Sequence, residues 1–154
     1  MKTKKKILAF VLFAMLALLV LASCNNGESA PPVSEGDTIT VVVSGEVTAE
    51  YTVELSKIKG SSGLVSVLDY LEEIDAIDYE IDGTMLTKVG ELENDALKGE
   101  WIYVYTTVKK DIDVSQYATT VEYKGQSIWN SGVGANSMTL EKDAVIYIGL
   151  IVYG

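Results

Sequence analysis

The N-terminal segment that ends at Cys24, the only cysteine, most constrains what this 154-residue chain can fold into. Four lysines lie within the first six residues, an unbroken apolar run occupies residues 7–21, and the small residues Ala22 and Ser23 follow. This is the order of a secretory signal peptide. A helix of this run would be about 22 Å long, shorter than the roughly 30 Å hydrocarbon core of a bilayer. We expect residues 1–23 to be a signal peptide, so the mature domain folds without an internal disulfide.

Leu21-Ala22-Ser23-Cys24 resembles the lipobox of bacterial lipoproteins at all four positions. The resemblance implies a diacylglyceryl group on the Cys24 sulfur and cleavage that makes Cys24 the new N-terminus. Two acyl chains hold a protein stably at a membrane, whereas one chain binds marginally. We therefore expect a bacterial protein with a lipid anchor in the cell membrane, facing outside the cytoplasm. The alternative is an ordinary secreted protein.

The mature chain is strongly acidic. All 22 acidic residues follow Cys24, whereas four of the 12 lysines lie in the signal, which leaves a net charge of −14. Arginine and histidine are absent. Such a surface repels phosphates, so we expect no nucleic-acid partner. The acidity suits the solubility of an exported domain, and the alternative is attraction of cations or basic partners.

Residues 24–37 include both prolines of the chain among small polar residues. This composition cannot bury a core and favours a flexible linker. We expect a lipidated N-terminus and flexible tether over 24–37, followed by a single α+β domain over 38–154.

The apolar pattern of the domain changes between period two and helical spacing. Leu64, Val67, Leu68 and Leu71 predict an amphipathic helix over about 63–74. Period-two alternation and apolar runs predict strands over 39–44, 47–55, 79–81, 85–89, 101–108, 121–129 (a hairpin around Lys124-Gly125) and 144–153. The order predicts a β-grasp-like α+β fold, with a mostly antiparallel or mixed sheet and one packed helix. The last strand is apolar enough to be central and buried on both faces.

Aromatic residues are the main candidates for ligand contact. Trp101, Tyr103 and Tyr105 share one face of their predicted strand. They could form half of a sheet's core, or an exposed platform for a sugar, a planar ring or a peptide side chain. Trp129 and Asn130 begin a glycine-rich loop, where an aromatic side chain is less easily buried.

Asp78, Glu80, Asp82 and Gly83 reproduce the first half of a calcium-loop pattern. Val89 stands where the pattern requires a bidentate glutamate. A plain strand followed by an Asp-Gly turn explains the same residues. We expect no bound metal, with these three acids as weak candidates.

Few residues suggest catalysis. Histidine and the G-x-S-x-G motif are missing, and Cys24 is assigned to the lipid. Gly132 and Gly134 lack the lysine and helix that follow a phosphate loop. We expect no cofactor and no enzymatic activity, and a small carboxylate-dependent hydrolase stays as an alternative.

From about Ser61 to the C-terminus the chain resembles the transcobalamin-like C-terminal domain, a bacterial extracytoplasmic module related to the β-domain of cobalamin carriers. The matching residues are Ser62–Leu68, Trp101–Tyr103, Gly132–Ala135, Leu140–Asp143 and Ala144–Ile148. The resemblance implies a β-grasp-like fold and adds a corrinoid-like molecule to the ligands to be considered.

The chain also departs from that family. Lys142 replaces the usual glycine before Asp143, Thr106-Thr107 replaces an Asn-Gly turn, and residues 109–127 resemble an insertion. In the carriers this domain is one half of a two-domain clamp, and we expect a single domain here. Cobalamin contacts therefore do not transfer residue by residue.

These observations favour a lipid-anchored extracytoplasmic module that binds a small molecule, a glycan or a protein. The first alternative is a structural or adhesion domain that pairs with another surface protein, for example by strand addition at a sheet edge. The second is the carboxylate-dependent hydrolase.

Overall fold

The computed structural model describes residues 36–153. The predicted signal peptide, Cys24 and most of the tether lie outside the described residues. The elements in chain order are β1 (Thr38–Ser44), β2 (Thr48–Glu54), the 3₁₀ turn η1 (Leu55–Lys57), α2 (Gly63–Glu73), β3 (Tyr79–Asp82), β4 (Met85–Val89), β5 (Leu92–Glu93), β6 (Glu100–Thr106), η2 (Lys109–Asp111), β7 (Thr120–Tyr123), β8 (Gln126–Asn130), η3 (Ala135–Ser137) and β9 (Val145–Val152). Among these residues no helix is long and apolar enough to cross a membrane.

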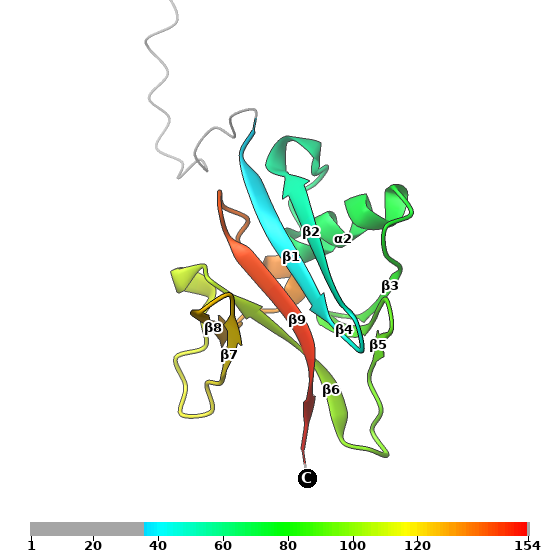
Figure 1. Cartoon of the computed structure of the whole chain (residues 1–154), viewed down its shortest axis with the longest axis vertical. Coiled ribbons are helices and arrows are strands. Elements are labelled where there is room, and N and C mark those ends of the chain that lie inside the picture. Colours follow the sequence, from blue (N-terminus) through cyan, green and yellow to red (C-terminus); the bar gives the residue numbers. More distant parts are fainter. Residues whose placement is uncertain (1–35, 154) are drawn as a thin grey trace, which may run out of the picture. The chain divides into compact units, whose positions relative to one another are not determined.

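Six strands form one mixed sheet in the order β2-β1-β9-β6-β8-β7, and β3-β4-β5 form a small antiparallel sheet. The first strand β1 runs parallel to the last strand β9, and the other pairs are antiparallel. One helix, α2, packs against the large sheet (Figure 1). The prediction of an α+β, β-grasp-like fold with one packed helix is confirmed.

The main core lies between α2 and one face of the large sheet. The apolar stripe of the helix faces alternate residues of the two central strands, as their period-two pattern requires. Fully buried members include Ile39, Val41, Leu64, Val67, Leu68, Ile146 and Ile148. Burying each such side chain contributes about 1.5–3 kcal/mol, so this layer holds the helix on the sheet.

The opposite face of the large sheet, here called the helix-free face, has a smaller buried layer of its own. Val42, Tyr105 and Ile128 are 0%, 5% and 0% exposed, yet none of them belongs to the main core. Val42 alternates along β1 with Val41 and Val43, which belong to the main core, and so points away from that core. It is nevertheless buried because the sheet curls over this face.

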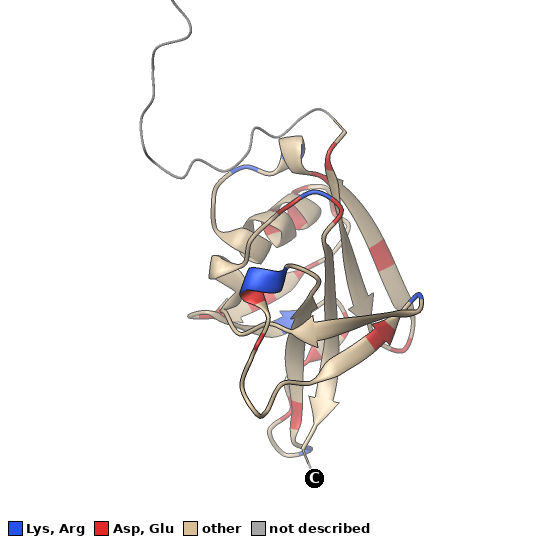
Figure 2. Cartoon of the chain, turned by 90° about the vertical axis from the view of Figure 1, so that its left-hand side faces the viewer, with Lys and Arg blue, Asp and Glu red and all other residues tan. Residues whose placement is uncertain are grey.

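The β7–β8 hairpin produces this curl. Strand β8 pairs with β6 at two positions, Tyr105 with Asn130 and Thr106 with Trp129, before the hairpin leaves the plane of the sheet (Figure 2). Its tip reaches the far edge strand β2. The Tyr123 hydroxyl donates to the Glu50 carboxylate at 2.5 Å, and the Lys124 ammonium donates at 2.8 Å. We call this contact between the two edge strands the edge clamp.

Strand β9 is central, as predicted, but only part of it is buried on both faces. Its pairing with β1 ends at Gly149 opposite Ser44. Beyond that point Leu150 is 39% and Val152 is 63% exposed. The apolar sequence of the strand did not reveal this, because it depends on where the β1–β2 turn falls.

Candidate binding face

The aromatic residues of β6 lie on the helix-free face. Ile102 and Val104 pack with the main core, so Trp101, Tyr103 and Tyr105, which alternate with them, point the other way. Tyr105 is buried, whereas Trp101 and Tyr103 are half-buried. The sequence left open whether these residues form core or an exposed platform. In the structure Tyr105 is a buried residue, and Trp101 and Tyr103 are partly accessible.

Five tyrosines from three strands and the C-terminal end form a continuous row on this face. Ring centroids lie 6.2 Å apart for Tyr153–Tyr103, 6.4 Å for Tyr103–Tyr105, 6.0 Å for Tyr105–Tyr147 and 6.2 Å for Tyr147–Tyr123. These spacings are typical of aromatic pairs, which contribute about 0.5–1.5 kcal/mol each beyond area burial. We call these residues the tyrosine row.

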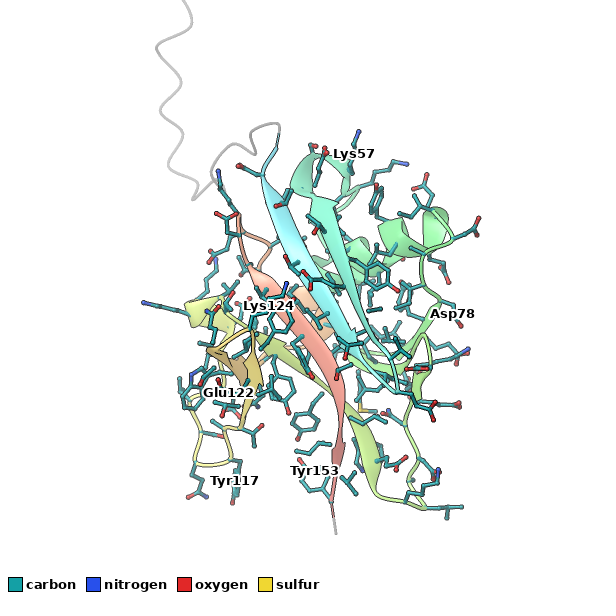
Figure 3. The ribbon with its side chains drawn as sticks, viewed as in Figure 1. Lys57, Asp78, Tyr117, Glu122, Lys124 and Tyr153 are labelled. Carbon is teal, nitrogen blue, oxygen red and sulfur yellow. The ribbon has the colours of Figure 1, made fainter. Side chains whose placement is uncertain are left out.

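The accessible end of the tyrosine row is at Tyr153, which is 55% exposed, at the lower end of β9 in Figure 3. The hydroxyls of Tyr103 and Tyr153 lie 2.5 Å apart. This hydrogen bond, followed by burial, raises the pKa of Tyr103 to about 12. Tyr103 therefore presents a neutral phenol at physiological pH.

The other end of the row is closed by the edge clamp. The Lys124 ammonium lies 5.0 Å from the centre of the Tyr123 ring. Its hydrogen bond to Glu50 lowers the pKa of that carboxyl and raises the pKa of Lys124. Because both groups are exposed, the ion pair itself stabilises the fold little, but it fixes where the hairpin tip lies.

The two loop candidates, Trp129 and Asn130, occupy different faces. Trp129 pairs with Thr106, so it lies on the face opposite Tyr105, where it is 43% exposed. Asn130 lies beside Tyr105 and is 5% exposed. Its side chain accepts from Thr119 N at 2.7 Å and donates to Asp113 at 3.2 Å. The structure therefore places Asn130 as a support for loop 112–119.

The acidic candidates do not converge on one point. Asp78 forms an ion pair with Lys88 at 2.7 Å, which lowers the pKa of the carboxyl. Glu80 pairs across the small sheet with Lys88, and Asp82 leads into the turn between β3 and β4. Within residues 36–153 no group of three or more acidic, histidine or cysteine side chains is arranged to hold a metal ion.

A cavity of about 220 Å³ lies between the β3–β4 turn, β6 and the glycine-rich loop. Thr84, Met85, Val104, Ser131 and Val133 are among its lining residues. Sequence reasoning missed it, because nothing local indicates that the β3–β4 turn meets loop 131–135. It likewise missed Tyr153 as a member of the tyrosine row, since that requires β9 to be the neighbour of β6.

Comparison with known proteins adds little to this geometry. No protein-family model and no curated protein matches the chain. One similar solved structure is that of a candidate metal-binding protein from Ruminococcus gnavus ATCC 29149. It has 16% sequence identity and a TM-score of 0.48, over 77% of this chain and 99% of that chain. The chain is a small α+β domain, and the resemblance to transcobalamin-like domains stays a prediction.

Proposed function

We propose that the domain is a binding module whose ligand contacts the open end of the tyrosine row. One observation carries the proposal: aromatic side chains form a continuous row outside the main core, on the face that the helix does not cover. The row leads from buried Tyr105 to exposed Tyr153. Rings held by such packing give contact area at low conformational cost.

The ligand classes that suit this face are a small molecule, a glycan or an exposed segment of another surface protein. Each can place a planar or apolar surface on Tyr103, Tyr153 and Trp101. The transcobalamin-like resemblance adds a corrinoid-like molecule. With the lipobox at Cys24, we place the module at the outer side of a bacterial membrane through a lipid anchor.

A binding role accounts for the polar groups better than a hydrolytic one. Asp111 is the one buried carboxylate among residues 36–153. It accepts hydrogen bonds from the backbone and hydroxyl of Thr139 at 2.5 and 3.1 Å. Through these bonds the Asp111 carboxylate holds loop 138–140 against η2. We therefore assign Asp111 a structural role rather than that of a catalytic acid or base.

A thermal-shift screen with sugars, corrinoids and small aromatic compounds tests the proposal. A specific ligand at 100 times its Kd adds about 2.7 kcal/mol of stability. We expect Tyr153→Ala to abolish the shift and Trp129→Ala, an exposed aromatic on the other face, to keep it. The reverse pattern would move the site to the Trp129 face and contradict the proposal.

A further inference from the structure

The described domain carries a large negative charge. Residues 36–153 contain 20 acidic residues and eight lysines, a net charge of −12. Acidic residues are spread over strands and loops, and lysines are few (Figure 2). Such a field raises the local concentration of cations, although by itself it selects no site.

The tyrosine row already accommodates one cation. Lys124 places its ammonium 5.0 Å from the Tyr123 ring centre, within the roughly 6 Å range of cation–π contacts. Both oxygens of Glu50 accept from the same ammonium at 2.8 Å. One phenol ring and one carboxylate thus form the environment of a bound ammonium at the closed end of the row.

The open end repeats these two components. Tyr103 and Tyr153 meet edge to face at 6.2 Å and 61°. Asp113 is held beside Asn130, because its backbone N–H donates to Asn130 O at 2.9 Å and its carboxylate accepts from the Asn130 amide. Asn130 is in turn the cross-strand neighbour of Tyr105, the next tyrosine of the row after Tyr103. The negative charge of Asp113 is among the influences that raise the pKa of Tyr103.

Asp113 is held as an anion. Hydrogen bonds from Ser115 N at 2.8 Å and from the Ser115 hydroxyl at 3.1 Å lower the pKa of its carboxyl. In residues 36–153, the observed ion pairs and cation–π contacts engage lysines elsewhere. The Tyr103–Tyr153 end therefore has two rings and an anion two cross-strand contacts away, and none of these recorded ion pairs within residues 36–153 engages Asp113.

We infer that the Tyr103–Tyr153 end of the row, with Asp113, binds the ammonium group of a small organic cation. The inference rests on the proposed function and specifies its ligand class. The exposed ring of Tyr153, the half-buried ring of Tyr103 and one carboxylate suit a single small cationic group. The hydrogen bond between the Tyr103 and Tyr153 hydroxyls fixes the orientation of the two rings.

Choline and its uncharged isostere 3,3-dimethyl-1-butanol form a matched pair of probes. The full chain in a neutral detergent is titrated with each, and the tyrosine ring signals are followed by NMR. We expect choline to bind at least tenfold more tightly than the alcohol and to shift the Tyr103 and Tyr153 signals. Asp113→Asn and Tyr153→Ala should each weaken choline binding about tenfold, and the control Asp82→Asn, an acid in the β3–β4 hairpin, should leave it unchanged.

Equal affinity for the two probes would overturn the inference and leave the aromatic binding face standing. Choline binding that is unaffected by Asp113→Asn and Tyr153→Ala would overturn it as well, because the cation would then lie elsewhere on the acidic surface. If a trilysine peptide binds and choline does not, the small-cation inference is overturned in favour of a basic protein partner. If choline fails to bind while the thermal-shift screen finds a neutral ligand sensitive to Tyr153→Ala, only the cation inference fails.

Discussion

Tyr79 and Tyr103 are phenols held neutral by different neighbours. Burial, followed by the hydrogen bond to Asp69 at 2.5 Å, raises the pKa of Tyr79 to about 12. The hydroxyl of Tyr153 and then burial raise the pKa of Tyr103 to about 12. Tyr79 is hydrogen-bonded to α2, whereas Tyr103 belongs to the tyrosine row. The ionisation of each tyrosine therefore probes a different side of the large sheet.

The alkaline titration of these tyrosines follows from their raised pKa values. An unfolded tyrosine ionises near pH 10, so the stability linked to each raised pKa is fully present below pH 10 and is lost between pH 10 and 12. We expect the free energy of unfolding to fall over that interval. A pH titration followed by tyrosinate absorbance should show tyrosines that ionise above pH 10. Tyr79→Phe and Tyr103→Phe should each remove one of these groups. An unchanged titration in both variants would contradict the assignment.

Gly63, the first residue of α2, shows how one residue can determine where a helix lies. Its φ is +51°, and a Cβ there would meet the Met138 carbonyl oxygen at 2.6 Å and the Met138 nitrogen at 2.7 Å. The helix therefore begins directly against the backbone that follows η3. The helical spacing of apolar residues that predicted α2 says nothing of this contact.

Gly63→Ala should be more destabilising than an ordinary glycine replacement. A left-handed φ costs a residue with a Cβ roughly 1–2 kcal/mol, and the contact with the Met138 backbone adds to that cost. Gly83→Ala is the matched control, because Gly83 has a φ of +62° and open space around it. Urea denaturation should give a larger loss of unfolding free energy for Gly63→Ala. Equal losses would show that the helix start can shift without cost.

At the scale of elements, the β7–β8 hairpin depends on the edge clamp for its place over the helix-free face. Glu50 has a lowered pKa because Lys124 and Tyr123 donate hydrogen bonds to it. A carboxyl of this kind stabilises the fold above its ordinary pKa, near 4.3 for glutamate, and its contribution is lost as the pH falls. The hairpin should consequently be held at neutral pH and loosened in acid.

Hydrogen exchange of the β7–β8 amides measures this loosening. We expect Glu50→Gln to lower their protection factors at neutral pH and to remove most of the loss of protection that we expect in the parent chain on acidification. Glu54→Gln is the control, since Glu54 lies on the same strand and contacts Ser56 rather than the hairpin. If the two variants exchange alike, other contacts hold the hairpin and the clamp is incidental.

Local sequence patterns predicted the helix and most strands, but they did not predict the contacts between segments that are distant in the sequence. Ile39, Val41 and Val43 alternate cleanly, and the Lys124-Gly125 turn identified its hairpin. The contact of Tyr123 with Glu50 joins residues 73 positions apart. It depends on a curl of the sheet that no single segment encodes.

The candidate site was predictable only in part, for a related reason. The shared face of Trp101, Tyr103 and Tyr105 follows from strand periodicity alone. The addition of Tyr147 and Tyr153 requires knowing that β9 lies between β1 and β6. Asn130 looked like a loop residue open to ligand, because its bonds to Thr119 and Asp113 cannot be read from spacing.

At the scale of the whole domain, the two faces of the large sheet differ in composition. The helix side is an aliphatic core that secures the fold. The other side carries the tyrosine row, closed at one end by residues 120–126 of the stretch that resembles an insertion. An aromatic face is thereby held on rigid strands rather than on loops, which suits a preorganised binding surface.

We propose that the location of the protein depends on Cys24, which lies outside the described residues. If the lipobox resemblance holds, acyl chains on Cys24 attach the module to the membrane, because two chains together hold stably. Cys24→Ser should then move the protein from the membrane fraction to the soluble fraction, or leave an unprocessed precursor. Ser23→Ala, which keeps a small residue before the cysteine, should retain attachment. Undiminished membrane attachment of Cys24→Ser, with normal processing, would show that the residue is not the anchor.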